Sequence, residues 1–288
     1  MSKNILITGG SGFIGSHVVD SLIKRNYNVT IFDLVKPRRK DVKFIKGDLL
    51  NLSLLNKAVK KNKIIFHLAA VSDINKVKNI PVKTISTNII GTTNLLEASR
   101  KQNIKKFIFA STYYSESNAG NLYTTSKKAS ELIIENYNLL YGLNYTILRY
   151  PTAYGPRNRE VDAISIFTRK ALKNLTIIVH GSGQQKRNYL HVEDLAEGSM
   201  VALKSNLKNK TVTLASNKNI KIIDLAKKII KLTKSKSKIK FDRKIKRIDD
   251  FTSNFTSNNK IYNFLGWKPK FTLSSGLSKY IKNKNFVA

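Results

Sequence analysis

The stretch MSKNILITGGSGFIG (residues 1–15) decides the fold of this chain. Residues 3–8 are an apolar run that predicts a buried strand, and an amphipathic helix begins at Phe13 and Ile14. Between them stand glycines at the spacing G-x-x-G-x-x-G: Gly9, Gly12 and Gly15. Gly9 allows a tight turn, Gly12 lets backbone amides approach a pyrophosphate, and Gly15 lets the helix pack closely on the sheet. The stretch predicts a dinucleotide-binding loop.

The next strand supports this prediction. Residues 28–33 end in Asp33, about where a dinucleotide-binding fold places the carboxylate that binds the adenosine ribose. Because a carboxylate accepts hydrogen bonds from a ribose diol and repels a 2′-phosphate, the sequence favours NAD over NADP. The alternative is an ordinary strand–turn–helix in which Ser11 is the N-cap and Asp33 faces solvent.

Length and composition exclude several classes of protein. The 288 residues suffice for one large domain or two closely associated ones. No apolar run reaches the roughly 18 residues of a membrane span. The first strand begins at the N-terminus, so we expect no signal peptide and a cytoplasmic protein. The chain has no cysteine, and its four histidines are scattered without ligand spacing, so we predict no disulfide and no metal.

The formal net charge is extreme, at +34 from 52 basic and 18 acidic residues. Such a charge attracts polyanions, including nucleotide sugars, nucleic acid and anionic lipid. It is densest in residues 204–247, where the acids are Asp224 and Asp242. We interpret the lysines as solvated surface and expect only non-specific attraction of nucleic acid, because no segment matches a nucleic-acid-binding module.

Short apolar strands alternate with helices through the first half of the chain. Strands are predicted at residues 3–8, 28–33, 43–46, 63–68, 106–111 and 144–149. Helices are predicted at residues 13–25, 53–61, 84–101 and 123–141. The alternation indicates a parallel sheet with helices on both faces.

Two further loops follow strands of this sheet. Asp48, after the third strand, can accept a hydrogen bond from an adenine amine, or it is an ordinary turn aspartate. After the fourth strand, the run HLAA (67–70) places small residues at the carboxyl end of a strand, which leaves room for a cofactor. His67 has apolar neighbours, and we interpret it as structural.

The candidate catalytic residues lie after the fifth strand, which ends at Thr112. Tyr123 and Lys127 follow four residues apart, on one face of a helix. A lysine ammonium beside a phenol stabilises the phenolate and lowers the tyrosine pKa, so Tyr123 is a candidate general base. The Thr112 hydroxyl can bridge Tyr123 to a sugar hydroxyl.

Together these motifs resemble the extended short-chain dehydrogenases/reductases of the NAD-dependent epimerase/dehydratase family, close to the UDP-glucose 4-epimerase group. The resemblance runs almost end to end, through GGSGFIGSH (9–17), Asp33, Gly47-Asp48, HLAA (67–70), NIIGTTNLLEA (88–98), FAST (109–112), YTTSK (123–127), LRYPTAYGPRN (148–158), GSGQQKRNYLHVED (181–194) and LGWKPKFTLSSGL (265–277). It implies a Rossmann-type, doubly wound sheet with a smaller C-terminal α/β substrate-binding region. The implied division is a nucleotide domain at 1–155, to which 189–215 returns, and a substrate region within 156–288.

The resemblance also implies individual roles. Tyr123 removes the proton from the hydroxyl on carbon 4 of the sugar, Lys127 lowers its pKa and holds the nicotinamide ribose, and Thr112 stands at the family's catalytic Ser/Thr position. Further cofactor contacts fall on Phe13, Ile14, Asp48, Leu49, Leu68, Ala69, Ala70, Asn88 and Tyr150. Substrate contacts fall on Thr112, Tyr123, Thr152, Arg187 and Arg247, where a guanidinium can hold diphosphate oxygens in two places. Relatives form their dimer face from the helices at 84–101 and 123–141, so a homodimer is expected.

The chain departs from the family pattern near the expected substrate. Pro151-Thr152 replaces the usual F-N, Asn188-Tyr189 replaces D-F, and the segment between Thr112 and Tyr123 is short. Tyr113 and Tyr114 stand where the family's dehydratases carry an Asp-Glu pair, and the glutamate of its decarboxylases is also missing. These replacements argue against both of those reactions.

We therefore expect an NAD-dependent nucleotide-sugar epimerase, by preference a UDP-glucose/UDP-galactose 4-epimerase that oxidises carbon 4 transiently and returns hydride to the opposite face. The alternative enzyme is an NAD(P)-dependent oxidoreductase acting on a nucleotide sugar, which the same residues would serve. A third interpretation is a non-catalytic family member that binds RNA through its basic surface. The presence of Thr112, Tyr123 and Lys127 argues against it.

Overall fold

The computed structural model describes residues 3–116, 121–243 and 256–283 and divides the chain into two units. Unit 1 comprises Met1–Tyr150 and Ser199–Leu214, and unit 2 comprises Pro151–Gly198 and Ala215–Ala288. The sequence places the first boundary five residues later and the return at 189–215. The boundaries differ because the strand that ends at His191 pairs within unit 2, whereas the strand that ends at Thr213 joins the sheet of unit 1.

Unit 1 is built on a parallel sheet of seven strands in the order β10-β6-β5-β4-β1-β2-β3. The strands are β1 (Asn4–Thr8), β2 (Asn28–Asp33), β3 (Lys43–Lys46), β4 (Ile64–His67), β5 (Lys106–Thr112), β6 (Tyr145–Tyr150) and β10 (Lys210–Thr213). The chain moves outward from β1 through β2 to β3, then restarts at β4 on the other side of β1. This confirms the predicted doubly wound fold and puts the switch in strand order between β1 and β4.

Helices connect these strands. They are α1 (Phe13–Ile23), α2 (Leu52–Val59), α3 (Ile74–Val77), α4 (Pro81–Ile85), α5 (Gly91–Lys101) and α6 (Leu122–Tyr141). A π-helical turn, η1 (Ser86–Ile90), joins α4 to α5, and short 3₁₀ turns follow β5 (η2, Tyr113–Glu116) and α8 (η3, Met200–Leu203, and η4, Ser205–Leu207). The single helix expected at 84–101 is therefore two α-helices with a wider turn between them.

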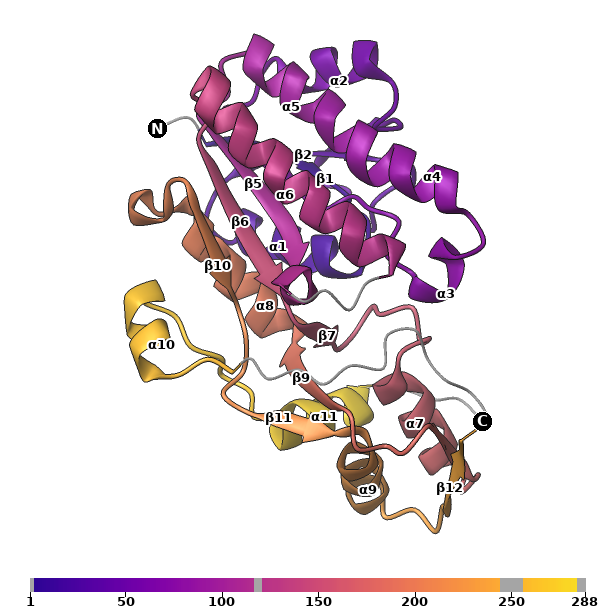
Figure 1. Cartoon of the computed structure of the whole chain (residues 1–288). Coiled ribbons are helices and arrows are strands. Elements are labelled where there is room, and N and C mark those ends of the chain that lie inside the picture. The colour runs from indigo at the N-terminus through magenta and orange to yellow at the C-terminus, as the bar shows by residue number, and fades with distance from the viewer. Residues whose placement is uncertain (1–2, 117–120, 244–255, 284–288) are drawn as a thin grey trace. The chain divides into compact units, whose positions relative to one another are not determined.

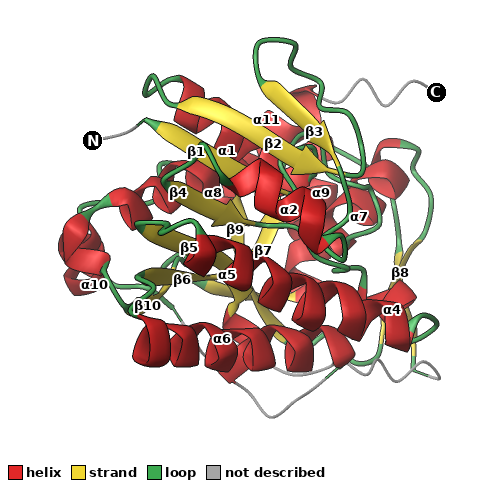
Figure 2. Ribbon diagram, turned by 90° about the horizontal axis from the view of Figure 1, so that it is seen from above, coloured by secondary structure: helices red, strands yellow, loops and turns green. Residues whose placement is uncertain are grey.

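The central strands are buried on both faces, which explains their continuous apolar sequences. On one face, α2, α5 and α6 pack against Leu6, Phe32, Ile65, Phe107 and Phe109. Figure 2 shows α5 and α6 lying side by side on this face. The helix α6 has defined ends, because the Asn121 side chain accepts a hydrogen bond from the Thr124 amide and Gly142 at φ +68° forms the C-cap.

Unit 2 contains two small sheets, and its elements can be followed in Figure 1. One sheet has the order β11-β9-β7, and the other pairs β12 with β8. The strands are β7 (Thr152–Tyr154), β8 (Ile177–His180), β9 (Lys186–His191), β11 (Asn219–Lys221) and β12 (Ile239–Asp242). The helices are α7 (Ala163–Leu172), α8 (Val192–Ser199), α9 (Ile222–Thr233), α10 (Asn259–Leu265) and α11 (Leu273–Asn283).

The core of unit 2 is separate from that of unit 1. Its largest buried side chains include Tyr154, Tyr280 and Phe167, packed with Leu225 and Ile229 of α9. Within the described ranges, no helix combines the length and apolar character needed to cross a membrane. The same ranges hold no cluster of three or more side chains of the kinds that bind metal ions.

Candidate active site

Glycine shapes the turn after β1. Gly9 has φ +73°, which side chains rarely tolerate, and a Cβ there would lie 2.5 Å from the backbone nitrogen of Ala69, in the loop after β4. A Cβ on Gly15 would lie 2.0 Å from the carbonyl oxygen of Gly9. Only glycine therefore lets α1 start so close to the turn and lets the loops after β1 and β4 meet at the switch in strand order.

The beginning of α1 presents backbone donors at this edge of the sheet. Gly12 is the N-cap, and no described side chain caps the helix. The amides of Phe13 and Ile14 belong to the first turn of α1, whose N–H groups have no partner within the helix and carry its positive dipole end. Gly12 has no side chain to block a ligand, and the backbone N–H groups of the first turn point along the helix axis. This arrangement fits the pyrophosphate of a dinucleotide.

Asp33 ends β2 beside this turn. Its Oδ2 accepts a hydrogen bond from the Ser11 amide at 3.0 Å, and its Oδ1 accepts one from the Val35 amide at 3.1 Å. The Ser11 hydroxyl donates to the Val35 carbonyl oxygen at 2.6 Å, so Ser11 is not the N-cap that the alternative interpretation required. These bonds hold the Asp33 carboxylate next to the phosphate loop, and each oxygen retains a lone pair for a ribose hydroxyl.

His67 ends β4 and is fully buried. Its Nδ1 lies 2.6 Å from the Thr8 hydroxyl, and its Nε2 lies 2.9 Å from the Thr92 hydroxyl. Burial, with a smaller contribution from the charge of Lys127, holds the pKa of His67 well below its ordinary 6.5. A neutral ring that is hydrogen-bonded on both sides supports the structural interpretation of His67.

The loop after His67 carries the half-buried residues Leu68, Ala69 and Ala70 and is fixed by Asn88 of the π turn. The Asn88 amide group bonds the Val71 backbone twice, at 2.8 and 3.0 Å, and donates to the Ser126 hydroxyl of α6 at 2.9 Å. Asn88 thus joins the loop after β4 to the helix that carries Tyr123 and Lys127. Its direct contact with a cofactor stays a prediction.

Lys127 is a buried cation, with 3% of its surface exposed. Its ammonium donates to the carbonyl oxygen of Ala110 at 2.6 Å and lies 4.3 Å from the ring centroid of Phe109. Burial lowers the pKa of Lys127 to about 7, and the carboxylate of Glu131 opposes that shift. The group is therefore poised to change charge near neutral pH.

Thr112 and Tyr123 complete the candidate catalytic set. Thr112 is the buried last residue of β5, two residues beyond the carbonyl that Lys127 contacts, and its Oγ1 accepts a hydrogen bond from the Tyr114 amide at 3.3 Å. Tyr123 is half buried in the first turn of α6, one turn before Lys127. The fold thus brings the three residues to the carboxyl end of β5, where an α/β sheet binds its ligands.

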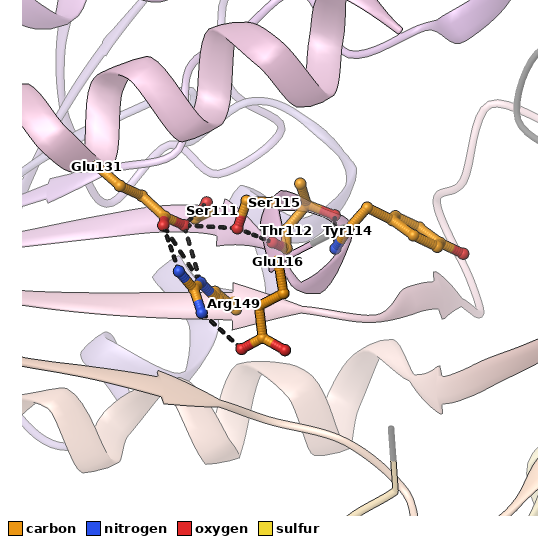
Figure 3. Close-up of polar contacts among 7 residues, drawn as sticks. All are labelled: Ser111, Thr112, Tyr114, Ser115, Glu116, Glu131 and Arg149. Carbon is orange, nitrogen blue, oxygen red and sulfur yellow. Dashed lines mark hydrogen bonds and ion pairs between the residues drawn. The ribbon is translucent and has the colours of Figure 1, made fainter. Parts of the chain in front are cut away.

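Sequence reasoning missed a buried ion pair next to this set. Figure 3 shows the carboxylate of Glu131, on α6, facing the guanidinium of Arg149, on β6. The Nη2–Oε2 distance is 2.6 Å, and the hydroxyls of Ser111 and Ser115 also donate to Glu131. The signal was present, because Tyr123, Lys127 and Glu131 repeat every four residues on one helix face.

The remaining cofactor predictions fall at the ends of β3 and β6. Asp48 is exposed, and its Oδ1 accepts a hydrogen bond from the Leu50 amide at 3.0 Å, as a turn aspartate would, so its adenine contact stays a prediction. Leu49 is buried, and a Cβ on Gly91 would lie 2.7 Å from the Leu49 Cβ. The Tyr150 hydroxyl lies 2.7 Å from the Ser199 hydroxyl, and burial raises the pKa of Tyr150.

The predicted substrate residues beyond β6 lie in unit 2. Thr152 begins β7 and pairs in register with Tyr189 of β9. Arg187 precedes Tyr189 by two residues, so strand alternation places Arg187 and Thr152 on the same face of this small sheet. Arg247 lies outside the described residues. The roles of all three stay predictions.

The fold and this site define a class of protein. A glycine turn at the switch in strand order, an acid at the end of β2 and a Tyr–Lys pair beside Thr112 are typical of Rossmann-type enzymes that couple proton transfer at an alcohol to hydride transfer. The chain belongs to the NAD dependent epimerase/dehydratase family, whose model matches residues 5–215. NAD is the cofactor of this family, and the glycine turn and Asp33 fit it.

Similar proteins cover nearly the whole chain. A Methanocaldococcus jannaschii protein named "Putative UDP-glucose 4-epimerase" is 35% identical over 98% of this chain and 99% of its own length. A Bacillus cytotoxicus protein named UDP-N-acetyl-alpha-D-glucosaminuronate decarboxylase is 32% identical over 83% of each chain.

Solved structures agree in fold. The UDP-glucose 4-epimerase of Thermotoga maritima, solved with UDP-glucose, has a TM-score of 0.89 at 28% identity and 97% coverage of both chains. The UDP-glucose 4-epimerase of Thermus thermophilus, solved with NAD, has a TM-score of 0.84 at 26% identity, covering 97% of this chain and 98% of that one.

Proposed function

We propose that this chain is an NAD-dependent nucleotide-sugar epimerase that interconverts UDP-glucose and UDP-galactose by inverting carbon 4. The observation that carries the proposal is the Tyr123–Lys127 pair on α6, with the Lys127 ammonium anchored 2.6 Å from the backbone of β5, next to Thr112. The relatives whose names specify UDP-glucose 4-epimerase support the choice of substrate.

In the proposed mechanism, Tyr123 as phenolate takes the proton from the hydroxyl on carbon 4. NAD, held by the glycine turn and Asp33, would supply the redox chemistry as a reversible acceptor of hydride from that carbon. The positive charge of Lys127 stabilises the phenolate, and the hydroxyl of Thr112 orients the sugar hydroxyl toward it. On the return step, Tyr123 gives the proton back, so the protein ends each cycle unchanged.

Two tyrosines favour epimerisation over the other reactions of the family. Elimination of water from the sugar needs a further acid and base, and the chain places Tyr113 and Tyr114 where the dehydratases carry Asp and Glu. Tyr113 is buried, and Figure 3 shows the Tyr114 ring pointing away from Glu131 and Arg149. A tyrosine side chain is ordinarily a far weaker acid than the aspartic or glutamic acid whose place it takes.

The test is proton NMR of the purified protein with UDP-galactose and no added cofactor. Appearance of UDP-glucose supports both 4-epimerisation and retained NAD. Stoichiometric formation of NADH on addition of NAD would favour the oxidoreductase alternative instead. No change in any nucleotide sugar, with or without NAD, would refute the proposal.

Replacement of Tyr123 by phenylalanine tests the assignment of the base. We expect Tyr123→Phe to lose at least about 100-fold in turnover, because general base catalysis contributes roughly that much or more. The variant should retain bound NAD, measured by absorbance after denaturation, since the phenol serves the sugar chemistry. Wild-type turnover in Tyr123→Phe would show that another group is the base.

A homodimer is part of the proposal. The outer surface of α6 exposes Leu132, Leu139 and Leu140, and Ile90, just before α5, is also exposed. Leu132 and Leu139 are seven residues apart and so share one face of the helix. Exposed aliphatic side chains on this surface are suited to contact a second copy of the chain.

A further inference from the structure

The structure places a carboxylate in the interior, one turn beyond Lys127. Glu131 is 4% exposed and accepts hydrogen bonds from Arg149 Nη2 at 2.6 Å and from Arg149 Nε at 3.1 Å. The hydroxyls of Ser111 and Ser115 also donate to it, as Figure 3 shows. Burying a charged pair is costly unless its polar atoms are satisfied. The two serine hydroxyls and two guanidinium nitrogens satisfy this carboxylate, which indicates that its burial serves a function.

Two of those donors flank the candidate catalytic threonine. Ser111 precedes Thr112 on β5, and Ser115 follows it in the 3₁₀ turn. The Ser115 hydroxyl lies 2.7 Å from the Thr112 carbonyl oxygen and 2.9 Å from Glu131 Oε1, and is shared between them. Glu131 therefore anchors the backbone on both sides of Thr112 to α6, the helix that carries Tyr123.

Arg149 extends the anchor to the end of the 3₁₀ turn. Its Nη1 lies 2.5 Å from Glu116 Oε1, while the rest of the guanidinium pairs with Glu131. Glu116 is the last residue of that turn, and its side chain is about half exposed. The planar guanidinium of Arg149 thus links β6 and α6 to the turn between Thr112 and Tyr123.

Glu131 also acts on Lys127, whose positive charge the proposed mechanism uses. Residues four apart on a helix lie on the same face, and the Glu131 carboxylate acts electrostatically on the Lys127 ammonium by raising its pKa against the effect of burial. Tyr123 lies one turn before Lys127 on the same helix, and His67 on β4, whose pKa the Lys127 charge helps to lower, is held neutral by burial. From β5 the ammonium meets the Ala110 carbonyl and the Phe109 ring, which carry no net charge.

We propose that Glu131 is a positioning residue that holds the Thr112 turn against α6 and supports the positive charge of Lys127 beside Tyr123. The inference rests on the proposed function for its catalytic meaning. The effect of the Glu131 charge on the titration of Lys127, both in unit 1, can be measured without turnover. Burial lowers the pKa of Lys127, and the Glu131 carboxylate raises it. The Glu131 charge therefore favours the charged form of Lys127, as the proposal requires.

The first experiment is NMR titration of Lys127 in the NAD-bound protein, with lysine labelled by ¹³C at Cε and the resonance assigned by its loss in Lys127→Arg. Glu131→Gln keeps the size of the side chain, removes its charge and leaves one of its two acceptor oxygens. We expect the Lys127 titration to move down by about one pH unit, since an opposite charge at this range shifts a pKa by one to three units. The alkaline limb of kcat/KM should move with it.

Glu116→Gln is the matched control, because it neutralises the other carboxylate on the same guanidinium. We expect it to leave the Lys127 titration in place. Ser115→Ala keeps the charge of Glu131 and removes one anchor, so it should lower kcat several-fold without moving the titration. If Glu131→Gln leaves the titration unchanged, or Glu116→Gln moves it equally, the inference is wrong.

These outcomes separate the inference from the proposed function. A wild-type protein that turns over no nucleotide sugar would refute the function, while the titration would still decide what Glu131 does to Lys127. If Glu131→Gln does not fold, Ser115→Ala becomes the deciding variant. An unaltered kcat in Ser115→Ala would then overturn the positioning role.

Discussion

Lys127 should make the protein more stable as the pH rises from 7 to 9. In the folded chain, burial lowers the pKa of Lys127 from its ordinary 10.5 to about 7. Below pH 7 both the folded and unfolded states hold the proton, and the cost of burying the charge is fully present. Between pH 7 and 10.5 the unfolded state binds more protons than the folded state, so the free energy of unfolding rises with pH.

The magnitude follows from the two pKa values. Each pH unit over which the unfolded state holds one more proton adds about 1.4 kcal/mol. At pH 7 about half of folded Lys127 is neutral, and by pH 9 nearly all of it is, so the rise between these values sums to about 2 kcal/mol. Lys127→Met has a side chain of similar length and no proton to lose, so it should lack this rise.

The assay is urea unfolding of wild type, Lys127→Met and Lys128→Met at pH 7, 8 and 9. Lys128 is the next residue on α6 and is exposed, so it controls for the loss of a lysine from this helix. We expect the wild type to gain about 2 kcal/mol relative to Lys127→Met across the range, and Lys128→Met to follow the wild type. A constant difference between wild type and Lys127→Met would refute the buried-cation argument.

Three other variants test the glycine turn, Asp33 and the proposed dimer face. Gly15→Ala should lose bound NAD and melt at a lower temperature, because its Cβ would lie 2.0 Å from the Gly9 carbonyl oxygen; undiminished NAD content after purification would contradict the fit of the glycine turn. Asp33→Asn should narrow the preference for NAD over NADP by about tenfold or more, since about 1.4 kcal/mol of charge repulsion corresponds to that factor; titration with both cofactors measures it, and an unchanged ratio would remove Asp33 from the ribose site. Leu132→Glu with Leu139→Glu should give a monomer by light scattering if α6 forms the dimer face, and a dimer of unchanged mass would place that face elsewhere.

The sequence predicted the sheet and the ends of its strands well, because these depend on local signals. The apolar run at 28–33 coincides with β2, the short segment predicted at 43–46 coincides with the edge strand β3, and the glycine turn lies where Gly9 and Gly15 required it. Buried parallel strands need continuous apolar residues, and a turn with positive φ needs glycine, so both can be read without tertiary information.

Features that depend on distant contacts were not predicted. Nothing near Asn88 signals a π turn, because the turn is stabilised by hydrogen bonds to Val71 and to Ser126 of α6. Arg149 was seen only as part of a family motif, and its pairing with Glu131 arises when β6 lies beside β5. The division of the units was misplaced because β9 looks like any short strand until its partners are known.

The π turn also constrains the length of the chain. The π turn Ser86–Ile90 closes i→i+5 hydrogen bonds and so holds one residue more than the α-helical turn that it replaces. Removing one residue there would let the turn close as an ordinary α-helix, whereas each residue added between α4 and α5 would turn α5 by about 100° around its axis. Leu95 and Leu96, both buried in the core, would then leave the sheet. The wider turn therefore absorbs one extra residue between α4 and α5, and we expect this segment to accept a one-residue deletion more readily than a further insertion.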